Sequence, residues 1–260
     1  MHGLAGCSSS WYVMSVVDMA KSKGWHSLVM VARGCGGVEL TTGVSFTAAR
    51  TKDFGETIQH IQSRYPGSPI YAIGYSLGAG LLAKYLGERG DASGISGAVC
   101  VSPPWDFHKT TEHFEVWSRH KLVRDLKLYV RQNYEKFKAL APQIDLDTVL
   151  KSANVREFDA NGVVPVIDHY RDVDDYYTDA SPKRFSREIT TPTLAISSED
   201  DPVCSVDGVP MDPNELGPGL VIVKTCYGGH VAYGKGWIPV GMSWADEVAF
   251  EWFEAHGANK

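Results

Sequence analysis

Ser76 stands in a pattern that can turn a hydroxyl group into a nucleophile. Residues 74–78 read Gly-Tyr-Ser-Leu-Gly, a GxSxG motif, and the apolar run Ile70–Gly74 predicts a buried strand leading into it. From Leu77 onward the sequence predicts a helix. Glycines on both sides of the serine allow a sharp turn that pushes its side chain outward, while the helix start offers free N–H groups to a developing negative charge. This context makes a chance match the weaker explanation, even in a chain with 26 glycines.

His230 is the candidate base that such a serine requires. The chain has nine histidines, and His230 follows the last predicted strand, in the sequence Tyr-Gly-Gly-His at 227–230. The two glycines predict a flexible loop that can carry the imidazole to the edge of a sheet. The other histidines fall in predicted helices, in a predicted cap or near the chain ends, where surface or core roles explain them.

The imidazole in turn needs a carboxylate that fixes its tautomer, and this acid should lie between the serine and the histidine in chain order. Residues 198–203 read Ser-Glu-Asp-Asp-Pro-Val and follow a predicted strand. Asp201 is favoured because it directly precedes Pro-Val, a turn-forming pair. Asp200 is the close alternative and Asp106, after an earlier strand, a distant one. One of the adjacent pair can instead cap the next turn.

The residues His2-Gly3-Leu4 resemble the His-Gly element whose following backbone N–H completes an oxyanion hole. On this interpretation the N–H groups of Leu4 and Leu77 bind the oxyanion together. An expression-related dipeptide would explain His2, but it would not explain the Gly-Leu-Ala-Gly that follows.

Two further clusters are interpreted as surface features. His120 and Asp125 form an HxxxxD spacing that suggests an acyltransferase, but in a predicted helical region solvated side chains explain them more simply. The stretch Asp168–Asp179, crowded with Asp and Tyr, predicts a solvated segment. We therefore assign no metal ligand and no cofactor-binding residue.

Short β-branched runs alternate with longer amphipathic stretches, which predicts an α/β fold with a parallel sheet flanked by helices. The predicted strands are Leu28–Ala32, Ile70–Gly74, Ala98–Ser102, Thr193–Ser197 and Leu220–Thr225. The predicted helices are Trp11–Lys23, Phe54–Arg64, Leu77–Glu88 and Trp244–Ala255. The candidate serine, acid and base each follow a strand, so we expect them to meet at the carboxyl edge of the sheet.

The alternation stops from about Trp105 to Ile189, where charged, aromatic, helix-compatible sequence takes over. This stretch predicts a helical cap at about 105–189, inserted into one α/β domain that spans residues 1–260.

The composition of the chain limits which partners it can bind and in which cellular compartment it is expected. A net charge of −6 with scattered basic residues argues against nucleic acid as a partner, because phosphate binding draws on clustered Lys and Arg. Five cysteines without a CxxC pair indicate neither a disulfide framework nor a thiolate zinc site, and they favour a reducing, intracellular setting. No apolar run is long enough to span a bilayer, and the first residues lack the layout of a signal peptide. Peripheral membrane contact through an apolar cap surface stays open, and none of these patterns specifies an oligomeric state.

Together these segments resemble the α/β-hydrolase superfamily. The resemblance is closer to its embryogenesis-associated, hydrolase-4 type branch, which includes abhydrolase-domain lipases and bacterial esterases. It is distributed over nearly the whole chain. It rests on His2–Leu4, Arg33–Gly37, Gly74–Gly78, Ser102–Asp106, Glu157–Asp159, Asp175–Tyr177, Asp200–Pro202 and Gly228–His230.

The resemblance implies an α/β-hydrolase fold and hydrolysis of carboxylic esters without a cofactor, through an acyl-enzyme on Ser76 and water activated by His230. The implied substrates are acylglycerols, phospholipids or short acyl esters. The resemblance also favours Asp201 over Asp200. Relatives carry a leading β-rich segment with a central strand, and some carry a membrane anchor. It therefore implies that N-terminal strands are missing here and that the location is cytoplasmic or membrane-associated.

Two other functions fit the same residues. An acyltransferase would use the same triad with an alcohol other than water as the acceptor. A hydrolase-fold binding protein would hold a small molecule or a partner without turnover. Covalent labelling by a fluorophosphonate probe that is lost in Ser76→Ala separates an enzyme from a binding protein.

Overall fold

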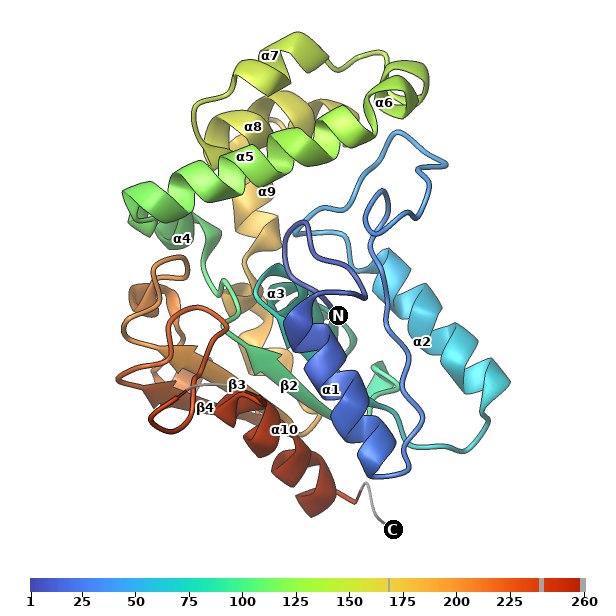
Figure 1. Ribbon diagram of the computed structural model, residues 1–260, viewed down its shortest axis with the longest axis vertical. Coiled ribbons are helices and arrows are strands. Elements are labelled where there is room, and N and C mark those ends of the chain that lie inside the picture. Colours follow the sequence, from blue (N-terminus) through green and yellow to red (C-terminus); the bar gives the residue numbers. More distant parts are fainter. Residues whose placement is uncertain (168, 239–240, 258–260) are drawn as a thin grey trace.

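Four parallel strands lie at the centre of the computed structural model, which describes residues 1–167, 169–238 and 241–257 (Figure 1). The strands pair in the spatial order β1-β2-β3-β4. Their bounds are β1 Tyr71–Tyr75, β2 Gly97–Val101, β3 Thr193–Ser198 and β4 Leu220–Thr225. The four strands predicted from Ile70 onward are thus confirmed, with ends that move by at most one residue.

The central strands are buried on both faces because successive side chains of a strand point to opposite sides of the sheet. Ala98 and Cys100 of β2 belong to one hydrophobic cluster, and Val99 and Val101 belong to another. All four side chains are fully shielded from solvent. This explains why β2 is a continuous apolar run rather than an alternating one.

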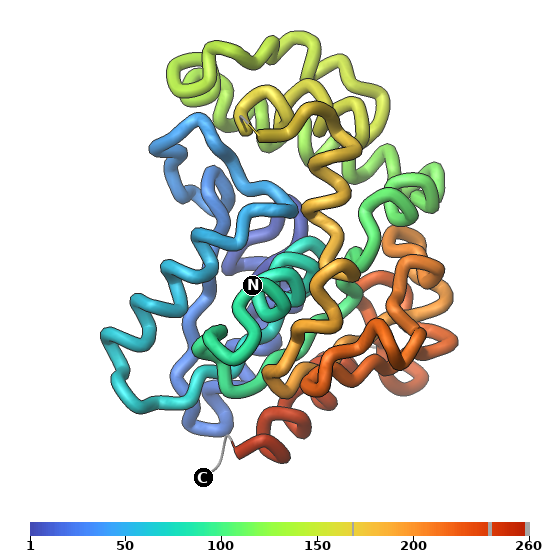
Figure 2. The backbone as a smooth tube through the Cα atoms, turned by 180° about the vertical axis from the view of Figure 1, so that it is seen from behind, coloured from blue at the N-terminus to red at the C-terminus, as the bar shows by residue number. Residues whose placement is uncertain are grey.

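Helices cover both faces of the sheet (Figures 1 and 2). The helices α2 (Lys52–Arg64) and α3 (Leu77–Arg89) contribute to the cluster on one face, and α1 (Trp11–Ser22) and α10 (Trp244–Ala255) to the cluster on the other. These are the four predicted helices, and their ends differ from the predicted ones by at most two residues.

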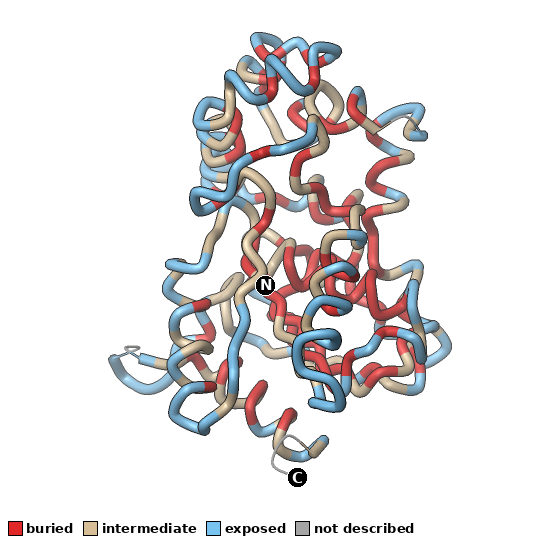
Figure 3. The backbone as a smooth tube through the Cα atoms, turned by 90° about the vertical axis from the view of Figure 1, so that its right-hand side faces the viewer, coloured by how far each residue is buried: buried red, intermediate tan, exposed pale blue. Residues whose placement is uncertain are grey.

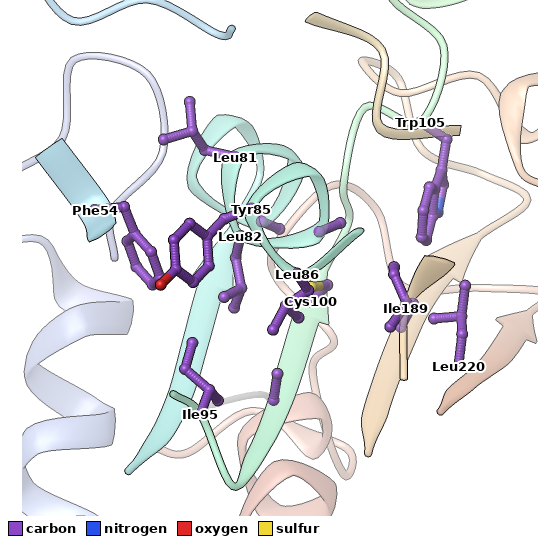
Figure 4. Close-up of a cluster of buried hydrophobic side chains, with 14 of the residues drawn as sticks. Phe54, Leu81, Leu82, Tyr85, Leu86, Ile95, Cys100, Trp105, Ile189 and Leu220 are labelled. Carbon is purple, nitrogen blue, oxygen red and sulfur yellow. The ribbon is translucent and has the colours of Figure 1, made fainter. Parts of the chain in front are cut away.

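Helix α3 is anchored by leucines that pack between the sheet and its neighbours, as Figure 4 shows. Leu81, Leu82 and Leu86 are each at most 1% exposed. Full burial of such a side chain is worth about 1.5–3 kcal/mol relative to leaving it in water. The start of α3, directly after Ser76, is therefore held firmly against the sheet.

Six α-helices lie between β2 and β3 in the sequence and stand above the sheet in Figure 1. They are α4 Phe107–His113, α5 Val116–Gln132, α6 Tyr134–Leu140, α7 Leu146–Lys151, α8 Val155–Gly162 and α9 Val173–Ala180. Short 3₁₀ segments are η1 Gly90–Ala92, η2 Val164–Val166, η3 Pro182–Glu188, η4 Val206–Gly208 and η5 Pro213–Glu215. The helical character predicted for residues 105–189 is confirmed, and no helix in the described residues is long and apolar enough to cross a bilayer.

Four of these helices, α5 to α8, share a hydrophobic cluster that is separate from the clusters beside the sheet. Leu126 and Val130 of α5 pack there with Phe137 of α6, Val149 of α7 and Phe158 of α8. Helices α5 to α8 are therefore held together by their own apolar contacts as well as by contacts with the rest of the chain.

The predicted strand at Leu28–Ala32 is wrong, because these residues form no ladder and Leu28 is 55% exposed. A strand requires a hydrogen-bonded neighbour. At the outer edge of β1 it is Met1 that bonds: its carbonyl oxygen accepts from the N–H of Tyr75 at 3.2 Å, and its amino nitrogen donates to the carbonyl oxygen of Ile73 at 2.5 Å. The apolar pattern at residues 28–32 favours an extended backbone. It forms no strand because no neighbouring strand in the described part of the chain pairs with it through backbone hydrogen bonds.

Candidate active site

Ser76 lies on the turn between β1 and α3 in a backbone conformation that is unfavourable for a residue with a side chain. Its φ is +52° and its ψ is −122°. Such a conformation costs about 1–3 kcal/mol and persists only where neighbouring contacts enforce it. Here the N–H of Ser76 donates to the carbonyl oxygen of Val101 at 2.9 Å, and its own carbonyl oxygen accepts from Ala79 and Gly80 in α3. The turn presents the hydroxyl at the carboxyl edge of the sheet.

Gly78 explains the second glycine of the motif. A Cβ atom at this position would lie 2.4 Å from the carbonyl oxygen of His2, which is far closer than a side chain tolerates. Glycine therefore lets the His2-Gly3-Leu4 segment pack against the first turn of α3.

His230 reaches the serine from the loop after β4. Its Nε2 lies 2.6 Å from Oγ of Ser76. The loop is tied back to the end of β3 on both sides of Gly229, because the hydroxyl of Ser198 donates to the carbonyl oxygen of Gly229 at 2.6 Å and the N–H of Gly229 donates to Asp200 at 2.8 Å. Gly229 has a φ of +59°, so the predicted glycine loop turns where a left-handed conformation is needed.

Asp201 holds the other side of the imidazole. Its carboxylate oxygens lie 2.8 Å and 3.0 Å from Nδ1 of His230. The carboxylate also accepts the N–H groups of Val203 and Cys204, at 2.8 Å and 2.9 Å, and the residue is 3% exposed. Because a carboxylate faces Nδ1, that nitrogen carries the proton and Nε2 is left free to accept the hydroxyl of Ser76.

The structure separates the alternatives that the sequence left open. Asp200 is exposed and accepts from Gly229, so it positions the histidine loop instead of contacting the ring. Asp106 caps α4 by accepting the N–H of Lys109 at 3.1 Å. His120 bonds to a carbonyl oxygen within α5, and Asp125 pairs with Lys121, so these two lie in a helix surface and not in the site.

Leu4 and Leu77, the expected oxyanion-hole donors, both line the same cavity as Ser76. Leu77 is the first residue of α3, so its N–H has no acceptor within the helix. The segment that carries Leu4 approaches very closely, since a Cβ atom on Gly3 would lie 3.0 Å from Cβ of Ser76. The role of the two N–H groups as an oxyanion hole stays a prediction.

His2 fixes that segment in place. It is fully buried, its Nε2 accepts the N–H of Ala32 at 3.0 Å, and its Nδ1 donates to the carbonyl oxygen of Gly3 at 2.7 Å. Burial lowers the pKa of the ring, which keeps it neutral in this tautomer. His2 is therefore part of the packed structure around the site.

Two positioning contacts were missed by sequence reasoning. The ring Nε2 of His113 donates to the backbone carbonyl oxygen of Asp201 at 2.9 Å. Tyr233, which is 2% exposed, bonds through its hydroxyl to Oγ of Ser102 at 3.0 Å and holds the histidine loop against the end of β2. Neither contact has a local sequence signal, because each joins residues that are far apart in the chain.

A cavity of about 110 Å³ opens beside Ser76 and extends among the helices above the sheet. Its wall is mostly aliphatic and aromatic. It includes Leu4, Phe46, Leu77, Phe107, Phe114, Leu122, Leu126, Val130, Phe137, Leu146, Val149 and Phe158. An elongated apolar group attached to the atom that Ser76 attacks would fit such a wall.

One carboxyl group, Asp159 of α8, belongs to this apolar wall. Its carboxylate accepts the hydroxyl of Tyr177 at 2.9 Å. Burial raises the pKa of Asp159 to about 7, and the hydrogen bond from Tyr177 only partly opposes that effect. The motifs Glu157–Asp159 and Asp175–Tyr177, which are distant in sequence, thus meet through a single buried hydrogen bond.

The described residues hold one group of side chains with metal-ligand chemistry, Asp201, Cys204 and His230, whose ligand atoms lie within 4.8 Å of one another. Two of them already bond to each other, and the thiol donates to the carbonyl oxygen of Ser102. Burial raises the pKa of the Cys204 thiol well above its usual range, so it stays protonated and is a poor metal ligand. We therefore interpret this cluster as part of the serine–histidine–aspartate site.

A parallel sheet with helices on both faces and a serine on a sharp strand-to-helix turn defines the α/β-hydrolase class. The chain belongs to the Hydrolase_4 family, described as serine aminopeptidase S33, whose model matches residues 1–211. Among curated relatives, the embryogenesis-associated protein EMB8 of Picea glauca is 32% identical over 99% of this chain, and phospholipase ABHD3 of Mus musculus is 31% identical over 97%. The chain spans 58% and 62% of the lengths of these two relatives.

Solved structures agree on the fold. An esterase of Pyrococcus furiosus superposes with a TM-score of 0.60 at 17% identity, covering 98% of this chain and 81% of that one. A monoacylglycerol lipase of Paleococcus ferrophilus gives a TM-score of 0.57 at 18% identity, covering 99% and 93% of the two chains. At these identities the likeness concerns the arrangement of strands and helices alone.

Proposed function

We propose that this chain hydrolyses carboxylic esters through an acyl-enzyme on Ser76. One observation carries the proposal. The carboxylate of Asp201, the ring of His230 and the hydroxyl of Ser76 form an unbroken chain of hydrogen bonds of 2.6–3.0 Å that ends at an apolar cavity. A weakly nucleophilic hydroxyl becomes reactive when a correctly oriented base can remove its proton.

In the first half of the reaction, Oγ of Ser76 attacks the ester carbonyl carbon while its proton passes to Nε2 of His230. The N–H groups of Leu4 and Leu77 stabilise the oxyanion. When the intermediate collapses, the ester C–O bond breaks and His230 gives its proton to the leaving alcohol. In the second half, water gives a proton to His230 and attacks the acyl group, and the proton returns to Ser76 as the acid departs. Throughout, Asp201 holds the imidazole and stabilises its charged form.

The proposed substrates are esters with an apolar acyl chain, such as acylglycerols, phospholipids or short acyl esters. The aliphatic and aromatic wall of the cavity supports this choice. So do the names of relatives, which include a phospholipase of Mus musculus and a monoacylglycerol lipase of Saccharomyces cerevisiae. We also propose that residues 105–189 form a cap on a single hydrolase domain, because helices α5, α7 and α8 supply much of the cavity wall.

A fluorophosphonate probe tests the nucleophile directly. We expect covalent labelling of the wild type and none of Ser76→Ala, with a fall in ester hydrolysis of about 10⁴-fold or more. A Ser10→Ala variant is a matched control, since Ser10 lies outside the site. Labelling of Ser76→Ala at the wild-type rate would refute the proposal, and a folded but unlabelled wild type would favour a binding protein without turnover.

Acyl transfer to an alcohol is the second candidate, since it shares the acyl-enzyme and differs only in the acceptor. A relative in Saccharomyces cerevisiae, 30% identical over 97% of this chain, is named as a medium-chain fatty acid ethyl ester synthase and esterase. Product analysis in the presence of glycerol or ethanol distinguishes the two reactions. Formation of a new ester in preference to the free acid would assign the transferase activity. A panel of esters of increasing chain length would define the acyl group.

A further inference from the structure

Helix α5 carries a charge opposite to that of the whole chain. The chain has a net charge of −6, yet the 17 residues of α5 include five basic residues and one acidic residue. The basic residues are Arg119, Lys121, Arg124, Lys127 and Arg131, and the acidic residue is Asp125. This helix therefore holds five of the 25 Lys and Arg residues of the chain and is locally basic.

Five exposed side chains of α5 lie on a single face, which we call the α5 stripe. It consists of Trp117, Lys121, Arg124, Leu128 and Arg131. Their spacing alternates between four and three residues, which places them along one side of a helix. Trp117 is 71% exposed and Leu128 is 49% exposed, and the side chains of Lys121 and Arg124 are 49% and 74% exposed.

The positive charge of the stripe is only partly balanced. Lys121 and Arg124 both pair with Asp125, at 2.6 Å and 3.2 Å. Among the residues that the structure describes, no other carboxylate forms an ion pair with a cation of α5. The stripe therefore presents cations interleaved with two large apolar side chains, and Val116, which is 67% exposed, extends its apolar end.

The same helix forms one wall of the cavity beside Ser76. Leu122, Leu126 and Val130 face that cavity, on the side opposite the stripe. Figure 1 shows α5 in front of α8 on the outside of the helical region, and the view from behind in Figure 2 shows α8 on the near side instead. In Figure 3 the outer parts of this region are largely exposed while its interior is buried. A surface bound to the α5 stripe would thus lie one helix thickness from the cavity.

We infer that the α5 stripe is a docking surface for a lipid bilayer that contains anionic lipids. Lysine and arginine side chains are attracted to such a surface, and tryptophan and leucine side chains gain by entering the boundary between headgroups and acyl chains. An acidic protein or a nucleic acid would match the charge, but neither explains the exposed Trp117, Val116 and Leu128. The inference adds an interaction surface to the proposed function and does not require that Ser76 be a nucleophile.

The test is the partition of the whole chain onto vesicles of phosphatidylcholine alone and of roughly two parts phosphatidylcholine to one part phosphatidylserine. We expect the wild type to bind the mixed vesicles and to bind less as salt is raised, because screening weakens the attraction. Lys121→Gln, Arg124→Gln and Arg131→Gln combined should lower the partition coefficient by roughly 10- to 100-fold. Trp117→Ala should lower it roughly tenfold.

Matched controls lie at the opposite end of the molecule. Lys21, Arg64 and Arg187 are exposed and lie at the ends of α1, α2 and η3, away from the helical region. Their combined change to Gln alters the net charge by the same amount, and Tyr65→Ala removes an aromatic side chain that is 46% exposed. Neither control should change the partition by more than about twofold.

Hydrolysis of a soluble short-chain ester separates this inference from the proposed function. The α5 variants should keep wild-type activity on that ester, and vesicle binding should persist in Ser76→Ala. Three results would overturn the inference. They are a wild type that ignores anionic vesicles, an equal loss of binding in the control triple variant, and α5-dependent binding of polyglutamate without binding of vesicles, which would assign the stripe to an acidic protein.

Discussion

Asp159→Asn probes the one carboxyl group in the apolar cavity wall. Asparagine is nearly the same size as aspartate, and its side-chain oxygen can still accept the hydroxyl of Tyr177. The change therefore removes a titratable group while it keeps the buried contact. Any difference that varies with pH between the two proteins then reports on the ionisation of Asp159.

The magnitude follows from the shift in pKa. Burial raises the pKa of Asp159 from 3.8 to about 7 in the folded chain. Between these values the folded chain binds more protons at this site than the unfolded chain, so stability falls as pH rises, and the full cost is present above pH 7. A shift of about three pKa units corresponds to about 4 kcal/mol.

The assay is urea unfolding of both proteins at about pH 4 and about pH 8, followed by circular dichroism. The amide N–H₂ of asparagine changes the unfolding free energy by the same amount at both pH values. The informative quantity is therefore how much the difference in unfolding free energy between variant and wild type changes from one pH to the other. Between about pH 4 and about pH 8, we expect the unfolding free energy of Asp159→Asn to rise by about 4 kcal/mol relative to that of the wild type. Asp91→Asn, at an exposed position, is the control. A difference that stays constant within about 1 kcal/mol would refute the burial argument.

Two further substitutions test the site and its support. Asp201→Asn should lower the rate of ester hydrolysis by about 10⁴-fold, because the imidazole loses the carboxylate that fixes its tautomer. Asp200→Asn should lower the rate by about tenfold or less, because it only loosens the loop that carries His230. Equal effects would contradict the assignment of Asp201 as the acid. Lys84, 1% exposed, pairs with Asp179 at 2.7 Å and Glu88 at 2.8 Å, so Lys84→Met should cost about 3 kcal/mol of unfolding free energy. Lys52→Met, which breaks the exposed pair with Glu56, should cost less than about 1 kcal/mol in the same urea titration.

Local patterns were enough to predict the four strands from Ile70 onward, the helices beside them and the three side chains, Ser76, His230 and Asp201, that hydrogen bonds join in the structure. Ser76 and His230 each carry a signal within a few residues, a glycine-flanked turn and a glycine loop. The choice between Asp201 and Asp200 was harder, because both are carboxylates in the same turn. Only the direction of each side chain separates them: one bonds to the ring of His230 and the other to the N–H of Gly229.

Other features depend on contacts that no short window contains. The segment Leu28–Ala32 has the composition of a strand, but pairing is decided by the neighbour that meets it, and its Ala32 bonds to the ring of His2. Lys121, Arg124 and Arg131 of α5 come to share one side only once the helix has formed. The hydrogen bond between Asp159 and Tyr177 likewise joins two helices, α8 and α9. The sequence resemblance could therefore single out Glu157–Asp159 and Asp175–Tyr177 without predicting that they contact each other.

The bond from His113 to the backbone of Asp201 has a mechanical consequence for the admission of bulky esters. A second bond lies next to it, from the N–H of Glu115 to the carbonyl oxygen of Pro202 at 3.3 Å. Together these two bonds fix the connection between α4 and α5 to the loop that carries Asp201. A movement of α4 and α5 away from the sheet would therefore also shift Asp201, which contacts the ring of His230. We therefore expect any opening that admits a long acyl chain to occur around α6 and α7, where it would leave the contact between Asp201 and His230 in place.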